Sequence, residues 1–306
     1  MDLKQIEYFV QVAELGSFTR ASQVMRVAQP AMSRQIRTLE LELRQTLFHR
    51  NGRGVTLTEA GKRLLAHGRG ILQQVARARL DLEDHRGVPA GRLALGLPPS
   101  VSRTLTGPLV AAFRERFPNA TLTVVEGLSI YILEWLAQGR IDCAVVHPVA
   151  ASGAVDLKLI VEEPLYLISA RGRRRRKGLI GPAVSLGELA ERELVIPSRP
   201  HSIRMLVETA LAGIGLEPRV GLEIESVPAI LDLVERAPLS AVLALNALRG
   251  SGHERALIAQ PIHAQSGQLA TQLWLATSTQ RPRGRLLELG ADLIVETLHA
   301  LWRRDA

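Results

Sequence analysis

The sequence predicts an α+β multidomain fold: an N-terminal winged helix-turn-helix, a long linker helix and a two-lobed α/β domain. Three observations carry this prediction. Short apolar stripes at helical spacing fill the first part of the chain and lead into a glycine-containing hairpin pattern. A segment without a strong helix breaker then runs as far as Gly87 and Pro89. From Gly91 onward, strand-like and helix-like segments alternate, which is typical of α/β units.

The third apolar stripe of the N-terminal part, from Met32 to Leu43, predicts a helix that begins at Gln29 or Pro30. Proline suits the first turn of a helix, because its missing N–H would have had no partner there anyway. Apolar residues recur at spacings of four, three and four, and therefore share one face that should pack against a core: Met32, Ile36, Leu39 and Leu43. The opposite face carries polar and cationic side chains: Ser33, Arg34 and Arg37.

Two shorter stripes upstream complete a small helical core. They span residues 3–13 and 21–25, and the hydroxyl of Thr19 can cap the start of the second helix. Downstream, "LFHRNGRGVTLT" places Gly52 and Gly54 between two short apolar pieces, as a hairpin with a cationic tip would. Helix, short turn, helix and hairpin together make a winged helix-turn-helix.

The arginines of this part have two readings. Taken alone, the third helix is explained equally well if Arg34 and Arg37 are only its solvated face. The wing and the polar helix start favour DNA instead, because arginine pairs with phosphates or forks onto a guanine edge. Ser33 and Gln29 can reach bases or backbone. The predicted DNA-binding residues are Gln29, Pro30, Ser33, Arg34, Arg37, Arg50 and Arg53.

The segment "FVQVAELGSFTRASQVMRVAQPAMSRQIRTLELELRQTLFHRNGRGVTLTEAG", from Phe9 to Gly61, resembles the N-terminal domain of LysR-type transcriptional regulators. The resemblance implies that the start of the third helix meets an operator in the major groove, with Arg53 of the wing near the backbone or minor groove. Two positions depart from the usual pattern. Ala28 stands where a serine is common, which removes a backbone contact. Arg44 stands where a glycine usually ends the recognition helix, which alters the turn into the wing.

Composition limits the classes of protein to consider. The chain has 306 residues, enough for two or three compact units, and 46% of them are hydrophobic. No stretch approaches the roughly 18 consecutive apolar residues of a membrane span, and the start "MDLKQIEYFV" lacks the apolar core of a signal peptide. We therefore expect a cytoplasmic protein without a membrane partner.

Metal sites and catalytic sites have no support in the sequence. Cys143 is the single cysteine, which excludes an intrachain disulfide and a cysteine-based zinc site. It lies in "RIDCAVVH", a buried-strand pattern, so a packing role is favoured over a redox switch. The eight histidines show no paired metal spacing, and no catalytic constellation appears. We expect no enzyme activity, no metal and no cofactor.

The net charge of +8 is concentrated in two places. Residues 1–90 hold 14 Lys and Arg against 9 Asp and Glu, whereas residues 91–306 hold 24 against 21. Six of those 24 cations lie in "RGRRRRK" at 171–177. This run lies between a strand pattern and a turn-rich piece, so we interpret Arg173 to Lys177 as a solvated loop rather than a second nucleic-acid site. It would still add nonspecific attraction to DNA.

Residues 59–88 form the predicted linker and dimerisation helix. Small and apolar residues recur in steps of three and four, as in the seam of a two-helix coiled coil, and the predicted dimerisation residues are Leu64, Ile71, Val75 and Leu82. Gly61, Gly68 and Ala78 would permit close approach in that seam. The alternative is a helix packed on its own domain. We favour dimerisation, because a helix-turn-helix dimer reads two half-sites.

The α/β part predicts a ligand cleft. Open α/β sheets bind ligands at the carboxyl ends of their strands, and two such units make a cleft between them. Candidate effector-binding residues follow strands, in loops: Ser100, Val101, Ser102, Ser129, Ser198, Arg199 and His201. Hydroxyls and the N–H groups of helix starts suit a polar or anionic small molecule. Each serine alone is also explained as a helix cap.

Residues from Gly91 to about Trp302 resemble the effector domain of LysR-type regulators, which implies a periplasmic-binding-protein-like fold. We expect an effector-binding domain at 91–306 after a winged helix-turn-helix at 1–58. Lobe I would comprise 91–162 and 267–306, and lobe II 163–266. "GLPPS" and "EGLS" look most like regulators of nitrogen assimilation. One departure from the family pattern lies before Asn246: Ala237, Pro238 and Ser240 replace the usual glycine-rich turn. This departure argues against a ligand contact by Asn246.

Three classes of function can be compared on these features. A solute-binding protein explains only the two lobes and would need an export signal. An enzyme would need a nucleophile with its base or a phosphate-binding glycine loop. A LysR-type transcription regulator explains every part. Its expected partners are a double-stranded DNA operator, a small-molecule effector, further copies in a homodimer or homotetramer, and RNA polymerase.

Overall fold

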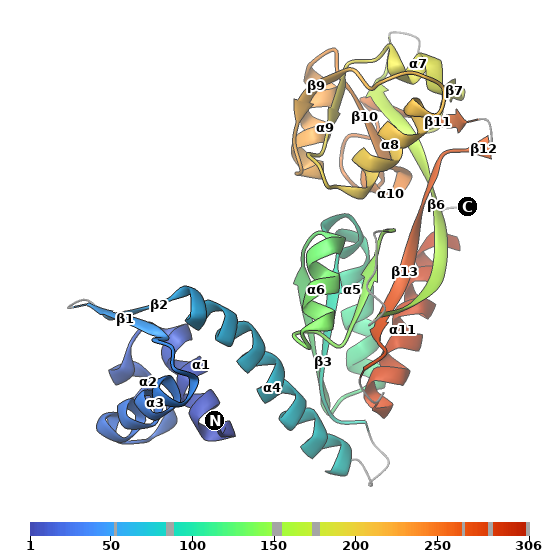
Figure 1. The fold of residues 1–306 in the computed structure, drawn as a ribbon. Coiled ribbons are helices and arrows are strands. Elements are labelled where there is room, and N and C mark those ends of the chain that lie inside the picture. Colours follow the sequence, from blue (N-terminus) through green and yellow to red (C-terminus); the bar gives the residue numbers. More distant parts are fainter. Residues whose placement is uncertain are drawn as a thin grey trace.

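The computed structural model describes residues 1–51, 54–83, 89–148, 155–172, 178–264, 267–280 and 284–303. It has a small helical domain with a hairpin, one long helix and two α/β lobes that share long strands (Figure 1). Arg53 and the run from Arg173 to Lys177 lie outside the described residues, as do the side chains of Arg50 and Leu82. None of the helices in the described part is long and apolar enough to cross a membrane.

The N-terminal domain contains α1 (Leu3–Leu15), α2 (Phe18–Met25) and α3 (Gln29–Leu43). The predicted apolar face of α3 is buried in the core, where Met32, Ile36 and Leu39 have no exposed surface. The cap of α2 lies two residues before the predicted one. Gly16 ends α1 in the left-handed conformation (φ 62°), and Ser17, not Thr19, accepts a hydrogen bond at the start of α2. The turn between the two helices is therefore shorter than the sequence suggested.

The predicted wing is an antiparallel hairpin of β1 (Phe48–Asn51) and β2 (Gly54–Leu57). It is held against the helices at two points. The N–H of Val55 donates to the carbonyl of Gly16 at 3.2 Å. The Glu40 carboxylate, near the end of α3, accepts from the N–H of Leu47 at 2.8 Å. The wing and α3 therefore belong to one packed unit.

The linker helix α4 (Glu59–Glu83) packs on its own domain along its first half. Leu64 and Ile71, predicted to face a second copy, contact the N-terminal core and are half-buried there. The first half of α4 therefore matches the alternative given above, a helix packed on its own domain. Val75 lines a groove of about 350 Å³ with side chains of α1, α2 and α4. Dimerisation stays a prediction.

Lobe I contains three parallel strands with helices on both faces. The strands are β3 (Gly91–Leu97), β4 (Ala120–Glu126) and β5 (Cys143–Val146). Its helices and its fourth strand follow: α5 (Pro99–Arg116), α6 (Ser129–Ala137), β13 (Ala270–Ser278) and α11 (Arg285–Arg303). Cys143 has no exposed surface and lies in the apolar core, as its predicted packing role requires.

Lobe II has the same layered plan. Its elements are β7 (Val184–Ser185), α7 (Leu186–Ala190), β8 (Leu194–Ile196), α8 (Ser202–Ala212), β9 (Val220–Glu223), α9 (Val227–Arg236), β10 (Ser240–Ala244), α10 (Leu245–Leu248), β11 (Leu257–Ala264) and β12 (Gly267–Gln268). Separate apolar clusters on the two sides of its sheet hold the helices in place. Of its strands, β8, β9 and β10 are parallel to one another.

One long strand, β6 (Val155–Ala170), runs through both lobes. Its residues up to Pro164 pair with β13, and those from Leu165 pair with β10 and β11. All of these pairings are antiparallel, so each lobe combines parallel strands with antiparallel ones. The sequence alternation cannot show this, because the partner β13 comes from the far end of the chain. The two lobes are thereby joined by continuous strands.

Arg44 ends α3 in the conformation that glycine prefers. Its φ is 51°, and its N–H donates to the carbonyls of Glu40 and Leu41. The turn into the wing therefore keeps the left-handed geometry, at the cost of strain at a residue with a Cβ.

We predict that Arg44→Gly stabilises this domain by about 0.5–1 kcal/mol, because the relieved strain exceeds the extra entropy of glycine in the unfolded chain. Amides of α3 in the full chain should then exchange their hydrogens about two- to fivefold more slowly. Arg44→Ala is the control, since it removes the charge and keeps the Cβ. Slower exchange in both variants, or in neither, would contradict the claim that backbone strain at Arg44 destabilises the domain.

Candidate nucleic-acid interface and ligand cavity

The face of α3 opposite its buried residues is polar and cationic. Gln29, Pro30, Arg34 and Arg37 are exposed, and Ser33 is half-buried. Neither Arg34 nor Arg37 forms an ion pair with any residue that the structure describes. Five of the predicted DNA-binding residues thus lie on one helix, and both guanidinium groups face solvent.

The surface is rigid because its backbone is held from behind. Gln35 accepts a hydrogen bond from Gln5 of α1 at 3.3 Å, in addition to the apolar packing of Met32, Ile36 and Leu39. Ala28 precedes α3 and makes no side-chain cap. The backbone of Arg50 lies in the wing beside this helix.

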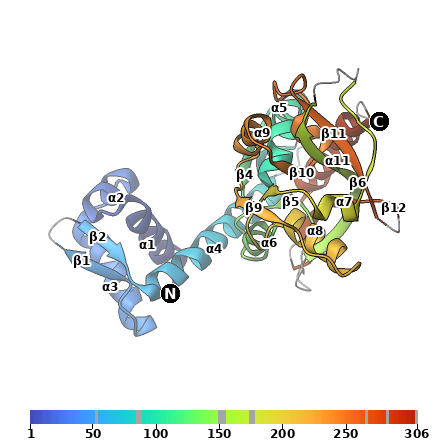
Figure 2. The ribbon, with the colours of Figure 1, turned by 90° about the horizontal axis from the view of Figure 1, so that it is seen from above.

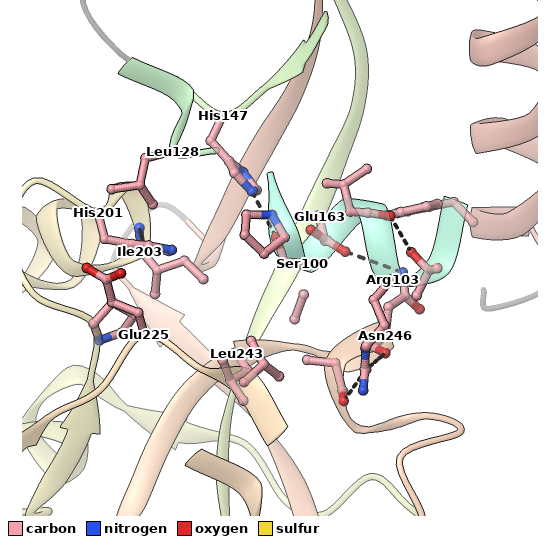
Figure 3. Close-up of a pocket in the computed structure, with 18 residues that line it drawn as sticks. Ser100, Arg103, Leu128, His147, Glu163, His201, Ile203, Glu225, Leu243 and Asn246 are labelled. Atoms are coloured by element: carbon pink, nitrogen blue, oxygen red, sulfur yellow. Dashed lines mark hydrogen bonds between the residues drawn. The ribbon is translucent and has the colours of Figure 1, made fainter. Parts of the chain in front are cut away.

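A second candidate site is a cavity of about 70 Å³ between the two lobes (Figure 3). This volume has room for about five water molecules or a small metabolite. Its walls are mostly apolar, with Leu128, Ile203 and Leu243 among them. The polar side chains that line it are Ser100, Arg103, Thr104, His147, Glu163, His201, Glu225 and Asn246.

The structure brings only part of the predicted effector-binding set together. Ser100, Val101 and His201 line the cavity, and Ser129 lines a smaller recess beside it. Three predicted residues line neither: Ser102, Ser198 and Arg199.

Ser102 is buried and donates to the Glu126 carboxylate at 2.7 Å, and Arg199 is exposed and paired with Glu208 at 3.0 Å.

The error at Ser102 has a structural cause. The sequence predicted that helix α5 begins after a loop, but α5 begins at Pro99. Successive helical residues point in different directions, so Ser100 and Ser102 cannot both face the cleft. Ser129 is likewise the first residue of α6 rather than a loop residue.

Two histidines face each other across the lobes. His147 follows β5 of lobe I; its burial, together with the nearby His201, lowers its pKa to about 4. His201 caps α8 of lobe II, where its ring accepts from the N–H of Ile203 at 3.2 Å. Burial also lowers the pKa of His201, against the opposing charge of Glu225. Both rings are therefore uncharged at neutral pH.

His147 was missed, although a signal for it existed. It is the first residue after the strand in "RIDCAVVH", the same position that selected the serines. Its main-chain N–H donates to the Ser129 hydroxyl at 3.0 Å, and its ring lies 3.5 Å from the Ser100 hydroxyl, a weak contact at most.

Arg103 joins the two lobes at the edge of the cavity. Its guanidinium, on α5 of lobe I, donates to the carbonyls of Asn246 at 3.0 Å and Ala247 at 2.5 Å, in α10 of lobe II. The Asn246 side chain donates to the Glu163 carboxylate at 3.3 Å. Asn246 therefore belongs to the cavity despite the changed turn before it. No local sequence pattern marks Arg103 or Glu163, which meet only in the folded chain.

The charges around the cavity do not favour an anion. Glu163 and Glu225 contribute two carboxylates, and Arg103 contributes one guanidinium that already binds two carbonyls. The histidines add no positive charge at neutral pH. The expectation of a polar ligand fits this lining, whereas a purely anionic ligand does not.

Comparisons with known proteins match both parts of the chain. Residues 86–299 match the family model described as the LysR substrate binding domain, and residues 3–62 match that of the bacterial regulatory helix-turn-helix protein, lysR family. The chain is 32% identical over 250 residues to the nitrogen assimilation regulatory protein Nac of Escherichia coli (strain K12), which covers 81% of this chain and 80% of that protein.

Two solved structures share the fold over nearly the full length. Full-length CbnR complexed with its target DNA has a TM-score of 0.70 at 23% identity and covers 97% of this chain and 100% of that one. A full-length OxyR variant from Pseudomonas aeruginosa has a TM-score of 0.73 at 22% identity, over 96% and 94%. Helix-turn-helix, linker helix and two-lobed domain thus occur together in the same order, and the chain belongs to the LysR family of bacterial transcriptional regulators.

Proposed function

We propose that this regulator reads its operator with the exposed face of α3 and the wing, under the control of a small molecule in the cavity between the lobes. The observation that carries the first part is the polar face of α3. Gln29, Pro30, Ser33, Arg34 and Arg37 share one helix that is buried only on its other side. Arg50 and Arg53 of the wing belong to the same proposal.

The proposed division of labour follows the elements. Residues 1–58 read DNA, residues 59–88 link and dimerise, and residues 91–306 bind the effector. The proposed boundary between lobes I and II, at residue 163, is supported by the change in the pairing of β6 between Pro164 and Leu165. A ligand that binds one lobe arrangement better than another would shift the population toward it.

We propose that the effector carries an apolar part together with a cationic or hydrogen-bond-donating group. Leu128, Ile203 and Leu243 would hold the apolar part. Glu225 and Glu163 supply acceptors, and a neutral imidazole ring can accept a further hydrogen bond.

The assembly belongs to the same proposal. A homodimer or homotetramer would present two readers to a two-fold symmetric operator. The groove beside Val75, between α1 and α4, supports a contact with a second copy. RNA polymerase as a further partner rests on the family resemblance, and the cytoplasm as the location rests on the sequence features given above.

Replacing Arg34 with alanine should weaken binding to a DNA fragment enriched from a random pool by about 1–3 kcal/mol, if its guanidinium forks onto a base. The measurement is the dissociation constant for that fragment and for unrelated DNA at the same salt concentration. Arg114→Ala, an exposed arginine on α5, controls for the lost charge. An equal loss on both DNAs would assign Arg34 to a phosphate, and no loss would remove it from the surface.

A thermal unfolding screen should find that small amines with an apolar part stabilise lobe I more than carboxylic acids of the same size. All three tryptophans of the chain, Trp135, Trp274 and Trp302, lie in lobe I, so their fluorescence reports its unfolding. A ligand at tenfold its dissociation constant adds about 1.4 kcal/mol. Glu225→Gln should reduce the effect. Stabilisation by the acids alone would contradict the proposed effector class.

His147 predicts a pH dependence of lobe I. Its pKa of about 4 lies below the ordinary value of 6.5, so the unfolded state takes up the proton first. Stability from this group is complete above pH 6.5 and is lost as pH falls toward 4. Between pH 6.5 and 5 the wild-type protein should lose about 1.6 kcal/mol more than His147→Gln. Parallel pH profiles of the two proteins in urea unfolding would show that the fold does not lower the pKa of His147.

A further inference from the structure

We propose that Gly70 is a positioning residue, which docks the linker helix on lobe I so that α6 couples the cavity to the DNA-reading domain. This inference rests on the proposed function, which assigns effector binding to the cavity and DNA binding to the N-terminal domain. The route itself rests on contacts at both ends of α6 and along α4 (Figures 1 and 2).

One end of α6 lies at the cavity. Leu128, immediately before the helix, lines the cavity, and Ser129 and Ile130 line the recess beside it. The Ser129 hydroxyl accepts the main-chain N–H of His147 at 3.0 Å. A ligand that moves either His147 or Leu128 therefore acts directly on the start of α6.

The body of α6 can transmit such a movement because it is short and packed. It has nine residues, about 13 Å of helix. Its inward side chains Ile132, Leu133 and Leu136 are buried in the apolar cluster of lobe I. A close-packed helix shifts as a unit instead of deforming along its length.

The other end of α6 meets the linker helix. A Cβ placed on Gly70 would lie 2.3 Å from the carbonyl oxygen of Gln138, the residue that ends α6. Gly70 is buried in this contact. Since real Cβ atoms do not approach an oxygen so closely, any other residue at this position would push α4 and α6 apart.

The linker is fixed to the reader just before this contact. A Cβ on Gly61 would lie 2.2 Å from the carbonyl oxygen of Leu47, and one on Gly68 would lie 3.1 Å from the Val10 side chain. Arg69 pairs with Glu14 of α1 at 2.9 Å. The glycines at 61 and 68, expected to face a second copy, thus seat α4 on its own domain, and Gly70 extends this rigid unit to lobe I.

The route can be tested from the DNA side, because coupling between two binding sites is reciprocal. The probe is the DNA fragment enriched by the wild-type protein, and the measurement is hydrogen exchange of the full chain with and without it. We expect exchange in residues 129–148 to change by about fivefold, the lower end of usual coupling. Residues 227–236 of α9, in lobe II, serve as the internal reference.

Gly70→Ala should keep DNA binding and abolish the change at residues 129–148. Alanine favours a helix over glycine, so a weakened α4 does not explain that loss. Gly187→Ala in α7 is the matched control, since its added methyl would lie 3.8 Å from the Ser185 hydroxyl, an ordinary contact. Unchanged exchange of α1 and β3 in the free variant shows that both parts remain folded.

The outcomes separate this inference from the proposed function. If the wild-type protein binds no fragment specifically, the proposed function fails. If it binds DNA and exchange at residues 129–148 stays unchanged, the coupling is wrong. If exchange changes equally in the wild-type protein and in Gly70→Ala, the route does not pass through Gly70.

Discussion

Burial of one face of α3 is the constraint from which the rest of the protein's organisation follows. Met32, Ile36 and Leu39 have no exposed surface, and each such side chain contributes about 1.5–3 kcal/mol relative to an exposed one. Because the side chains of a helix have fixed directions, this burial decides that Arg34 and Arg37 point to solvent. The wing is held on the same domain by Glu40, near the end of α3, and by Gly16.

The two-lobed domain is likewise built from rigid parts that are joined by few contacts. β6 runs through both lobes and joins them, while the facing surfaces meet at the Arg103 contact with α10. In the proposed mechanism, a ligand beside that contact would change how the lobes fit without breaking a core. Glycines of α4 make close contacts with both neighbours: Gly61 and Gly68 with the N-terminal domain, and Gly70 with lobe I. The proposed effector site and the proposed DNA-reading surface thus belong to parts that contact the same helix.

The sequence predicted the features that depend on spacing within one segment. The faces of α3, the wing and the buried strand around Cys143 follow from local periodicity, and the structure has them all. The start of α5 was missed because Ser100 to Ser102 were placed in a loop after the strand, although Pro99 lies in the first turn of α5 as Pro30 does in α3. The rule that proline suits the first helical turn applied to both.

Other features could not be predicted from local patterns. Arg103 and Glu163 reach the cavity only because α10 and β6 are brought beside α5 by the fold. Leu64 and Ile71 have a coiled-coil spacing that is equally satisfied by the protein's own N-terminal core. No local sequence pattern marks Gly70, because its contact is with the carbonyl of Gln138, 68 positions later in the chain.

The measurement that tests the central claim most directly is recovery of genomic DNA fragments bound by the purified full-length protein at near-physiological salt. If α3 and the wing read an operator as paired units, the fragments should share a motif with dyad symmetry, with half-sites about one helical turn apart or a multiple of it. Weak, salt-sensitive binding without any shared motif would contradict that claim, because it would show a surface that contacts only phosphates.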